Sequence, residues 1–180
     1  EDIQADVDQT NLLITQVEGR IGIVDSLLTA LSSEGIQQNS NKAYEWWMKS
    51  IGFPDFVQND RTIQQLKSSG ALRIIRNRAV SDRIMEYDQA VRQIAVTQNN
   101  MNTVAANSTL FNQTFNFIQL AQKTGAPVPL TDGGKKMLNE AYANRAFWKF
   151  NLAGLRQRLA VLNKKGKDTA AFIKSQYGLQ

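Results

Sequence analysis

Four arginines lie close together in the stretch LKSSGALRIIRNRAVSDRIMEYDQAV, which runs from Leu66 to Val91. They are Arg73, Arg76, Arg78 and Arg83. Guanidinium groups at this density could bind an anionic ligand, a phosphate or a carboxylate of a partner protein. The interpretation we favour is a helix–turn–helix corner, in which the apolar residues between the arginines close the end of a bundle and the arginine heads stay in water. Gly70 would let the chain reverse there.

A second candidate site comes from polar residues at positions where the helical repeat requires an apolar one. They are Thr10, Gln98 and Arg145. If they met at one level of a bundle, they would form a buried polar layer that fixes the register or binds a small anionic ligand. The alternative we favour places Arg145 at the edge of its stripe, reaching water, and Thr10 and Gln98 near an exposed end. A buried guanidinium would otherwise need an acid such as Glu18 or Glu140.

The composition excludes most catalytic chemistry. The 180 residues include no histidine and no cysteine, which removes the commonest general base, the thiol nucleophile and most zinc sites. Glu86, Asp88 and Glu140 are the carboxylates near helix midpoints in the basic part of the chain, and no spacing pairs them. The sequence also lacks a calcium-loop motif. We therefore expect a protein that is not an enzyme and has no cofactor and no metal site.

Aromatic residues form two groups that could line a pocket for an apolar ligand. They are the Trp46-Trp47 pair and the set Phe111, Phe115 and Phe117. Aromatic residues at helical spacing are more typical of a packed core, and that is our interpretation here.

Charge is distributed unevenly along the chain. Residues 1–60 hold ten acidic and three basic side chains, whereas residues 61–180 hold eighteen basic and six acidic ones. Such asymmetry can indicate a basic surface that binds nucleic acid or faces a membrane. The basic residues are dispersed, however, and the aromatic residues lie on apolar stripes rather than between them. We therefore expect an acidic helix packed beside basic ones, and no nucleic-acid partner.

Three long stretches carry apolar residues in alternating steps of four and three, the pattern of helices that pack at shallow left-handed angles. These stripes run from Ile3 to Leu31, from Val80 to Ala105 and from Leu138 to Leu162. No stretch of useful length alternates as a strand would. The sequence therefore predicts an all-α fold: an elongated up-and-down helical bundle with three long helices and two or three short ones, in one domain over residues 1–180.

Turn and cap residues predict where these helices begin and end. A short helix is predicted over 42–53, stopped by Gly52 and Pro54, and a second one is capped by Asn59 or Asp60 and ends near Lys67. The second long helix is predicted to continue through 109–122. The last long helix is predicted to have its cap at Thr131 or Asp132. Gly19 and Gly22 are predicted to admit a neighbouring helix or to mark a bend. LNKKGKD, residues 162–168, predicts a break before a terminal helix over 169–177.

The segment IGFPDFVQNDRTIQQLKSSGALRIIRNRAVSDRIMEYDQAVRQI, Ile51–Ile94, resembles a Bacteroidetes family of small proteins of unknown function. The matching features are the Leu66–Ser69–Gly70–Leu72–Ile75–Asn77 pattern and the Ile84–Tyr87 step. The leading EDIQADVDQTNLLI, Glu1–Ile14, is also similar to a helix of that family. Together these segments cover about half of the chain. Members of the family typically have one transmembrane helix near the N-terminus, followed by a helical region.

The resemblance implies a membrane-anchored protein whose anchor lies upstream of Glu1 and whose helical domain is extracytoplasmic, in the periplasm. It implies no catalytic or binding residue. The chain itself holds no apolar run near the ~20 residues that span a bilayer. Because it enters an amphipathic helix at once, we expect it to be a processed or trimmed product.

These observations lead to two expectations about function. The first is a non-enzymatic helical-bundle domain that acts in protein–protein interaction, including self-association, or in sensing. The second is a bundle that binds a small anionic ligand around Arg145. Contacts with a ligand or partner are expected at Arg73, Arg76, Arg78 and Arg145.

Overall fold

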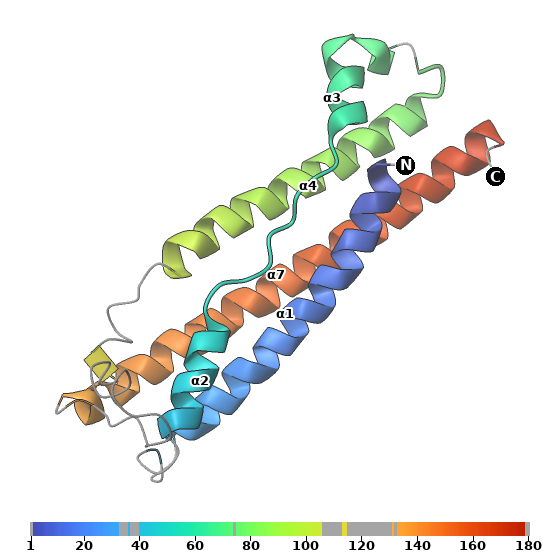
Figure 1. Ribbon diagram of the computed structural model, residues 1–180. Coiled ribbons are helices and arrows are strands. Elements are labelled where there is room, and N and C mark those ends of the chain that lie inside the picture. The colour runs from blue at the N-terminus through green and yellow to red at the C-terminus, as the bar shows by residue number, and fades with distance from the viewer. Residues whose placement is uncertain are drawn as a thin grey trace. The chain divides into compact units, whose positions relative to one another are not determined.

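A computed structural model of the protein describes residues 2–32, 36, 40–73, 75–105, 113–114, 131 and 133–178. Its helices are α1 (Asp2–Ser32), α2 (Ser40–Ser50), α3 (Arg61–Ser68), the 3-10 helix η1 (Ala71–Arg73), α4 (Arg78–Ala105) and α7 (Gly134–Tyr177). None of the residues in these ranges forms a strand. The predicted all-α helical bundle is therefore confirmed, with α1, α4 and α7 as its three long helices (Figure 1).

The chain forms two compact units. Unit 1 comprises Glu1–Gln16, Pro54–Asn99 and Leu155–Gln180, and unit 2 comprises Val17–Phe53 and Asn100–Gly154. The expectation of a single domain over residues 1–180 stays a prediction. Each unit has its own buried residues and its own polar contacts.

The apolar stripes predicted from the sequence are the buried faces of the long helices. The buried stripe positions are Val7, Thr10, Val17, Val24, Leu28 and Leu31 in α1, Val80, Ile84, Tyr87, Val91, Ile94, Gln98 and Met101 in α4, and Ala141, Arg145, Trp148, Leu152, Leu155, Leu159 and Leu162 in α7. Burial of these faces accounts for the helices better than intrinsic propensity does, because amphipathic helices gain most of their stability from tertiary packing.

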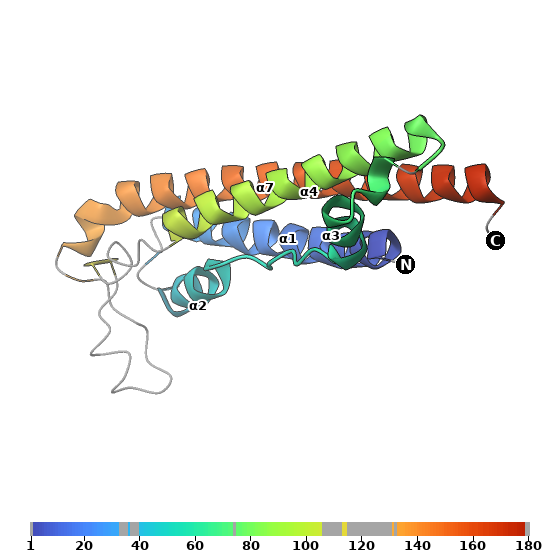
Figure 2. The ribbon, with the colours of Figure 1, turned by 90° about the horizontal axis from the view of Figure 1, so that it is seen from above.

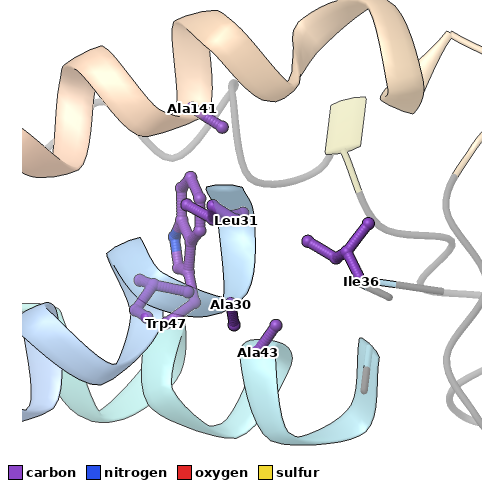
Figure 3. Close-up of a cluster of buried hydrophobic side chains, with 7 residues drawn as sticks. Ala30, Leu31, Ile36, Ala43, Trp47 and Ala141 are labelled. Carbon is purple, nitrogen blue, oxygen red and sulfur yellow. The ribbon is translucent and has the colours of Figure 1, made fainter. Parts of the chain in front are cut away.

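Unit 2 is built around a tryptophan. Trp47 of α2 is 1% exposed and packs in one cluster with residues of α1 and with Ala141 of α7 (Figure 3). Trp148 of α7 is equally buried, and its indole N–H donates to the backbone carbonyl of Ser50 at 2.9 Å. Gly52 follows with a φ of +75°, a left-handed conformation that suits glycine, so α2 stops about where the sequence predicts.

In unit 1, residues 54–60 run without helix until α3 begins (Figure 2). The predicted corner after α3 is confirmed at Gly70, whose φ is +70° and whose N–H donates to the carbonyl of Lys67 at 3.3 Å. Asn77 then starts α4, because its side-chain oxygen accepts from the N–H of Ala79 at 3.0 Å.

The predicted break at residues 162–168 is wrong, because α7 runs uninterrupted from Gly134 to Tyr177. Gly166 serves close packing instead: a Cβ at this position would lie 2.7 Å from Cγ2 of Val7 and 3.4 Å from a ring carbon of Tyr87. The lysines beside it do not interrupt the helix either. Lys164 pairs with Asp168 at 2.5 Å, one helical turn later.

Gly19 and Gly22 do not have the close-packing role predicted for them. A Cβ added at either position would meet no atom within 4 Å among the described residues. The predicted continuation of the second long helix lies outside the described residues, except for Gln113 and Thr114, which are helical. The Phe111, Phe115 and Phe117 group and the cap at Asp132 also lie outside the residues that the structure describes. Thr131 is not at the cap position, because α7 begins at Gly134 and the residue before it is Gly133; the Thr131 hydroxyl donates to the carbonyl of Gln113 instead.

Replacing Gly22 and Gly166 by alanine should change the free energy of unfolding in opposite directions. We expect Gly22→Ala to raise the free energy of unfolding by up to about 1 kcal/mol, since alanine has the higher helix propensity and the site has room. We expect Gly166→Ala to lower it by about 1–2 kcal/mol, because the added methyl overlaps Val7. Urea unfolding followed by far-UV circular dichroism measures both changes. A stabilising Gly166→Ala would show that α1 and α7 are not in close contact there.

Candidate binding pocket and its polar framework

The described arginines of the corner lie at the surface. Arg73, Arg76 and Arg78 are all exposed. Arg78 has one long ion pair, 4.0 Å from Asp82, and its side chain is 93% exposed. Arg83 lies over the ring of Phe172 at 4.4 Å, an arrangement that covers apolar surface with the guanidinium plane. The contact with a ligand or partner expected at these residues stays a prediction.

Arg145 is in a different environment from the one expected. It is only 5% exposed, so the expectation that it reaches water from the edge of its stripe is wrong. Its guanidinium donates to the side-chain oxygen of Asn144 and to the hydroxyl of Ser50, and it lies 4.7 Å over the ring of Trp47. Burial lowers the pKa of Arg145 to about 10. Within the described part of the chain, no carboxylate bonds to it.

Thr10 and Gln98 are buried too, so their expected place near an exposed end is also wrong. The side-chain amide of Asn163 donates to the Thr10 hydroxyl at 2.8 Å and to the carbonyl of Val7 at 2.9 Å, which joins α7 to α1 within unit 1. Gln98 donates to the carbonyl of Pro54 at 3.3 Å. The hypothesis of one polar layer is therefore replaced by separate local networks, since Arg145 belongs to the contacts of unit 2.

Asp6 is the centre of the polar network in unit 1. Its carboxylate is 1% exposed and accepts from the backbone N–H and the side-chain amide of Asn59, both at 2.9 Å. It also accepts from the Tyr87 hydroxyl at 2.6 Å. Burial and this hydrogen bond raise the pKa of Tyr87 far above its usual range, so the phenol remains a donor. The network ties the non-helical segment before α3 to α1 and α4.

Asp88 holds α3 against α4. It is 1% exposed and accepts from the ammonium of Lys67 in α3 at 2.6 Å and from Nε of Arg92 at 2.9 Å. Burial by itself would raise the pKa of Asp88, but the hydrogen bonds from Lys67 and Arg92 outweigh it and lower that pKa. At the other end of α3, the carboxylate of Asp2 accepts from the N–H of Thr62 at 3.0 Å. This is the position at which a cap from Asn59 or Asp60 was expected, and neither side chain provides it.

A lowered pKa in the folded state makes Asp88 a source of acid sensitivity. Its stabilising contribution is present above the unfolded pKa, about 4, and is lost as the pH falls through the lower folded value. We expect Asp88→Asn to cost about 1–2 kcal/mol at neutral pH and progressively less below about pH 4. Urea unfolding of both proteins between about pH 7 and pH 3 measures this gap. Asp82→Asn is the exposed control. If the difference in free energy of unfolding between the parent and Asp88→Asn did not depend on pH, Asp88 would not be a source of acid sensitivity.

A cavity of about 770 Å³ opens in unit 1 beside these contacts. Its apolar lining residues are Ile3 and Ala5 of α1, Ile63 and Leu66 of α3, Ile84 of α4, and Ala170 and Ile173 of α7. Four helices therefore contribute to one apolar surface, with α3 lying beside the first turns of α1 (Figure 2). Ligand sites for small molecules typically have 300–1,000 Å³ and a mainly apolar lining.

Polar residues also line the pocket: Asp2, Gln4, Asp8, Thr62 and Lys174. Hydrogen bonding from Thr62 lowers the pKa of Asp2. Asp8 accepts from the side-chain amide of Gln4 at 3.0 Å, a neutral donor. In the part of the chain that the structure describes, Lys174 has no hydrogen-bond or ion-pair partner. The pocket thus combines an aliphatic surface with charges of both signs.

Sequence reasoning did not find this pocket. Ile3 and Ile84 were recognised only as members of helical stripes, and Ile63 and Ile173 lie in short amphipathic segments that gave no reason to connect them. The signal that could have been used is the apolar face of α3, on which Ile63 and Leu66 are three residues apart. The sequence does not reveal which partners that face meets.

Comparison of the chain with models of protein families, with curated proteins and with solved structures found no match. In the described residues, no helix combines the length and the apolar character that a membrane span requires. The same residues contain no group of three or more acidic side chains placed to hold a metal ion. The geometry of the pocket is therefore the main guide to function.

Proposed function

We propose that the protein is a non-enzymatic helical-bundle domain that acts in sensing, by binding a small apolar molecule in the pocket of unit 1. The observation that carries this proposal is the aliphatic cavity of about 770 Å³ lined by α1, α3, α4 and α7. A ligand there would contact both α3 and the longer helices, so its presence would affect how firmly α3 is held. The Arg145 site is the weaker candidate, because Asn144, Ser50 and Trp47 already surround its guanidinium.

Membrane attachment and an extracytoplasmic location are part of the proposal. Their support is the resemblance of Ile51–Ile94 and Glu1–Ile14 to a family whose members have a transmembrane helix near the N-terminus. Fractionation of cells that make the full-length protein tests this part. Recovery in the membrane fraction, with the domain accessible to protease from the periplasmic side, is the expected result. Recovery in the soluble cytoplasmic fraction would contradict it.

The binding proposal is tested with a neutral, environment-sensitive naphthylamine dye. All three tryptophans, Trp46, Trp47 and Trp148, belong to unit 2, so intrinsic fluorescence does not report directly on the pocket. We expect saturable binding of one dye molecule, with an emission shift to shorter wavelength.

The matched variants are neighbours in α7. Ala170 lines the pocket, whereas Ala171 is exposed and does not. We expect Ala170→Phe to fill the cavity and weaken dye binding at least about tenfold, since bulk in the cavity displaces the ligand. Ala171→Phe should bind as the parent does. Equal binding by both variants, with unchanged circular dichroism, would refute the pocket as the site.

Protein–protein contact is a second candidate function, favoured by exposed aromatic residues on α7 within unit 2. Tyr142, Phe147 and Phe150 are 41%, 53% and 74% exposed. Aromatic side chains are enriched in interfaces, and contiguous exposed apolar patches mark interaction sites. Size-exclusion chromatography with light scattering, on the parent and on Phe150→Ser, tests self-association. A dimer that the substitution dissociates supports it, and a strict monomer at high concentration argues against it.

A further inference from the structure

The apolar residues that line the pocket in unit 1 are all aliphatic in the described part of the chain. The larger ones are Ile3, Ile63, Leu66, Ile84 and Ile173, and none of the described lining residues is aromatic. Aromatic ligands gain specific stacking energy from aromatic side chains, which this surface does not offer. Branched aliphatic side chains instead suit a flexible alkyl chain, whose burial is driven by the hydrophobic effect and needs no fixed ring geometry.

The charged groups at the pocket restrict what the polar end of such a ligand can be. Among the described residues, the ammonium group of Lys174 has no partner, and the carboxylate of Asp8 accepts only from the neutral amide of Gln4. The carboxylate of Asp2 accepts from the N–H of Thr62, and the positive charge of Arg61 acts on it as well, so its charge is partly offset within the protein. Among the described lining residues, Lys174 on α7 and Asp8 on α1 are therefore the cation and the anion best placed to meet ligand charges.

We propose that the pocket binds an aliphatic amphiphile with a zwitterionic headgroup, an inference that rests on the proposed function of the pocket. The alkyl chain lies against the isoleucines, the anionic group of the head pairs with Lys174, and its cationic group pairs with Asp8. A ligand with only one charge would form an ion pair with either Lys174 or Asp8. It would leave the other side chain without a group of opposite charge.

The test uses amphiphiles of one chain length below their critical micelle concentrations: an alkylphosphocholine, an alkyl glucoside, an alkyl sulfate and an alkyltrimethylammonium salt. Each displaces the naphthylamine dye from the full chain in a competition titration. Exposed ion pairs contribute modestly, so we expect the phosphocholine to bind about tenfold more tightly than the uncharged glucoside. Equal affinity for the phosphocholine and the sulfate would overturn the role of Asp8, and equal affinity for all four would overturn the headgroup proposal.

Two substitutions separate the contributions of the charges. We expect Lys174→Gln and Asp8→Asn each to weaken binding of the phosphocholine about threefold and to leave binding of the glucoside unchanged. Lys167→Gln, an exposed change on the same helix as Lys174, and Asp82→Asn, an exposed change on α4, are the matched controls. If glucoside affinity fell equally with phosphocholine affinity, the two side chains would have a structural role, and the proposal would be wrong.

The outcomes also distinguish this inference from the proposed function. If the dye and the glucoside bind and Ala170→Phe abolishes both, the pocket is the site even where headgroup selectivity is absent. If neither binds, the proposed function itself fails. Co-flotation with phosphatidylcholine vesicles identifies the source of the ligand: flotation that Ala170→Phe abolishes indicates a membrane lipid, and binding of monomers without flotation indicates a soluble amphiphile.

Discussion

Replacing Asp6 by alanine should lower the free energy of unfolding by about 3 kcal/mol, because the buried Tyr87 hydroxyl and two donor groups of Asn59 lose their acceptor at once. The carboxylate accepts from two groups of Asn59 and from the hydroxyl of Tyr87, and all three bonds are at most 2.9 Å long. No water replaces an acceptor easily at a residue that is 1% exposed. The loss should appear as a lower midpoint of urea unfolding with little change in slope.

Two further variants make the Asp6 prediction specific. Asp6→Asn keeps one oxygen for Asn59 and offers an N–H to the Tyr87 oxygen, so its cost should be smaller, about 1 kcal/mol. Asp8→Ala removes an exposed carboxylate two residues away and should change stability by less than about 0.5 kcal/mol. If Asp6→Ala were as mild as Asp8→Ala, the carboxylate would not be the buried hub of unit 1.

Trp47→Ala should be more damaging, with a loss of about 4 kcal/mol, because a whole indole leaves a packed site. Trp47 is 1% exposed at the centre of the cluster of unit 2 (Figure 3). Its removal also takes away the aromatic face over which the Arg145 guanidinium lies at 4.7 Å. A buried cation would then keep only neutral hydrogen-bond acceptors, which adds to the cost.

The neighbouring tryptophan is the control for this prediction. Trp46 is only partly buried and packs against the edge of the same cluster. Trp46→Ala should therefore cost about half as much or less. Far-UV circular dichroism is the appropriate signal for both variants, since each changes the tryptophan fluorescence directly. Equal losses would contradict the assignment of Trp47 as the central core residue of unit 2.

The helices could be predicted because their pattern is local. A period of three and four residues places Val80, Tyr87 and Ile94 on one face wherever the partner helix lies, and all three are buried. The left-handed conformation of Gly70 could be predicted as well, since a glycine after a Ser-Ser pair is typical of the end of a helix. Features that depend on neighbours along the chain could thus be predicted from the sequence.

Features that depend on tertiary contacts could not be predicted from the sequence. From the sequence, the stretch LNKKGKD predicts a break, yet the helix continues through it, and the missing side chain of Gly166 admits Val7. Arg145 carries a charge that favours water, and only the fold brings Trp47 and Ser50 to it. The pocket could not be foreseen for the same reason, since its lining residues come from positions as far apart as Ile3 and Ile173.

The cap that α3 receives from Asp2 comes from a residue 60 positions earlier in the chain. An amide hydrogen in the first turn of a helix has no acceptor within that helix and ordinarily exchanges rapidly with solvent. That of Thr62 can be protected only while the start of α1 stays against α3. The rate of deuterium uptake at this amide under native conditions therefore measures how often the start of α1 separates from α3. Such a local opening of unit 1 can be measured before any ligand is known.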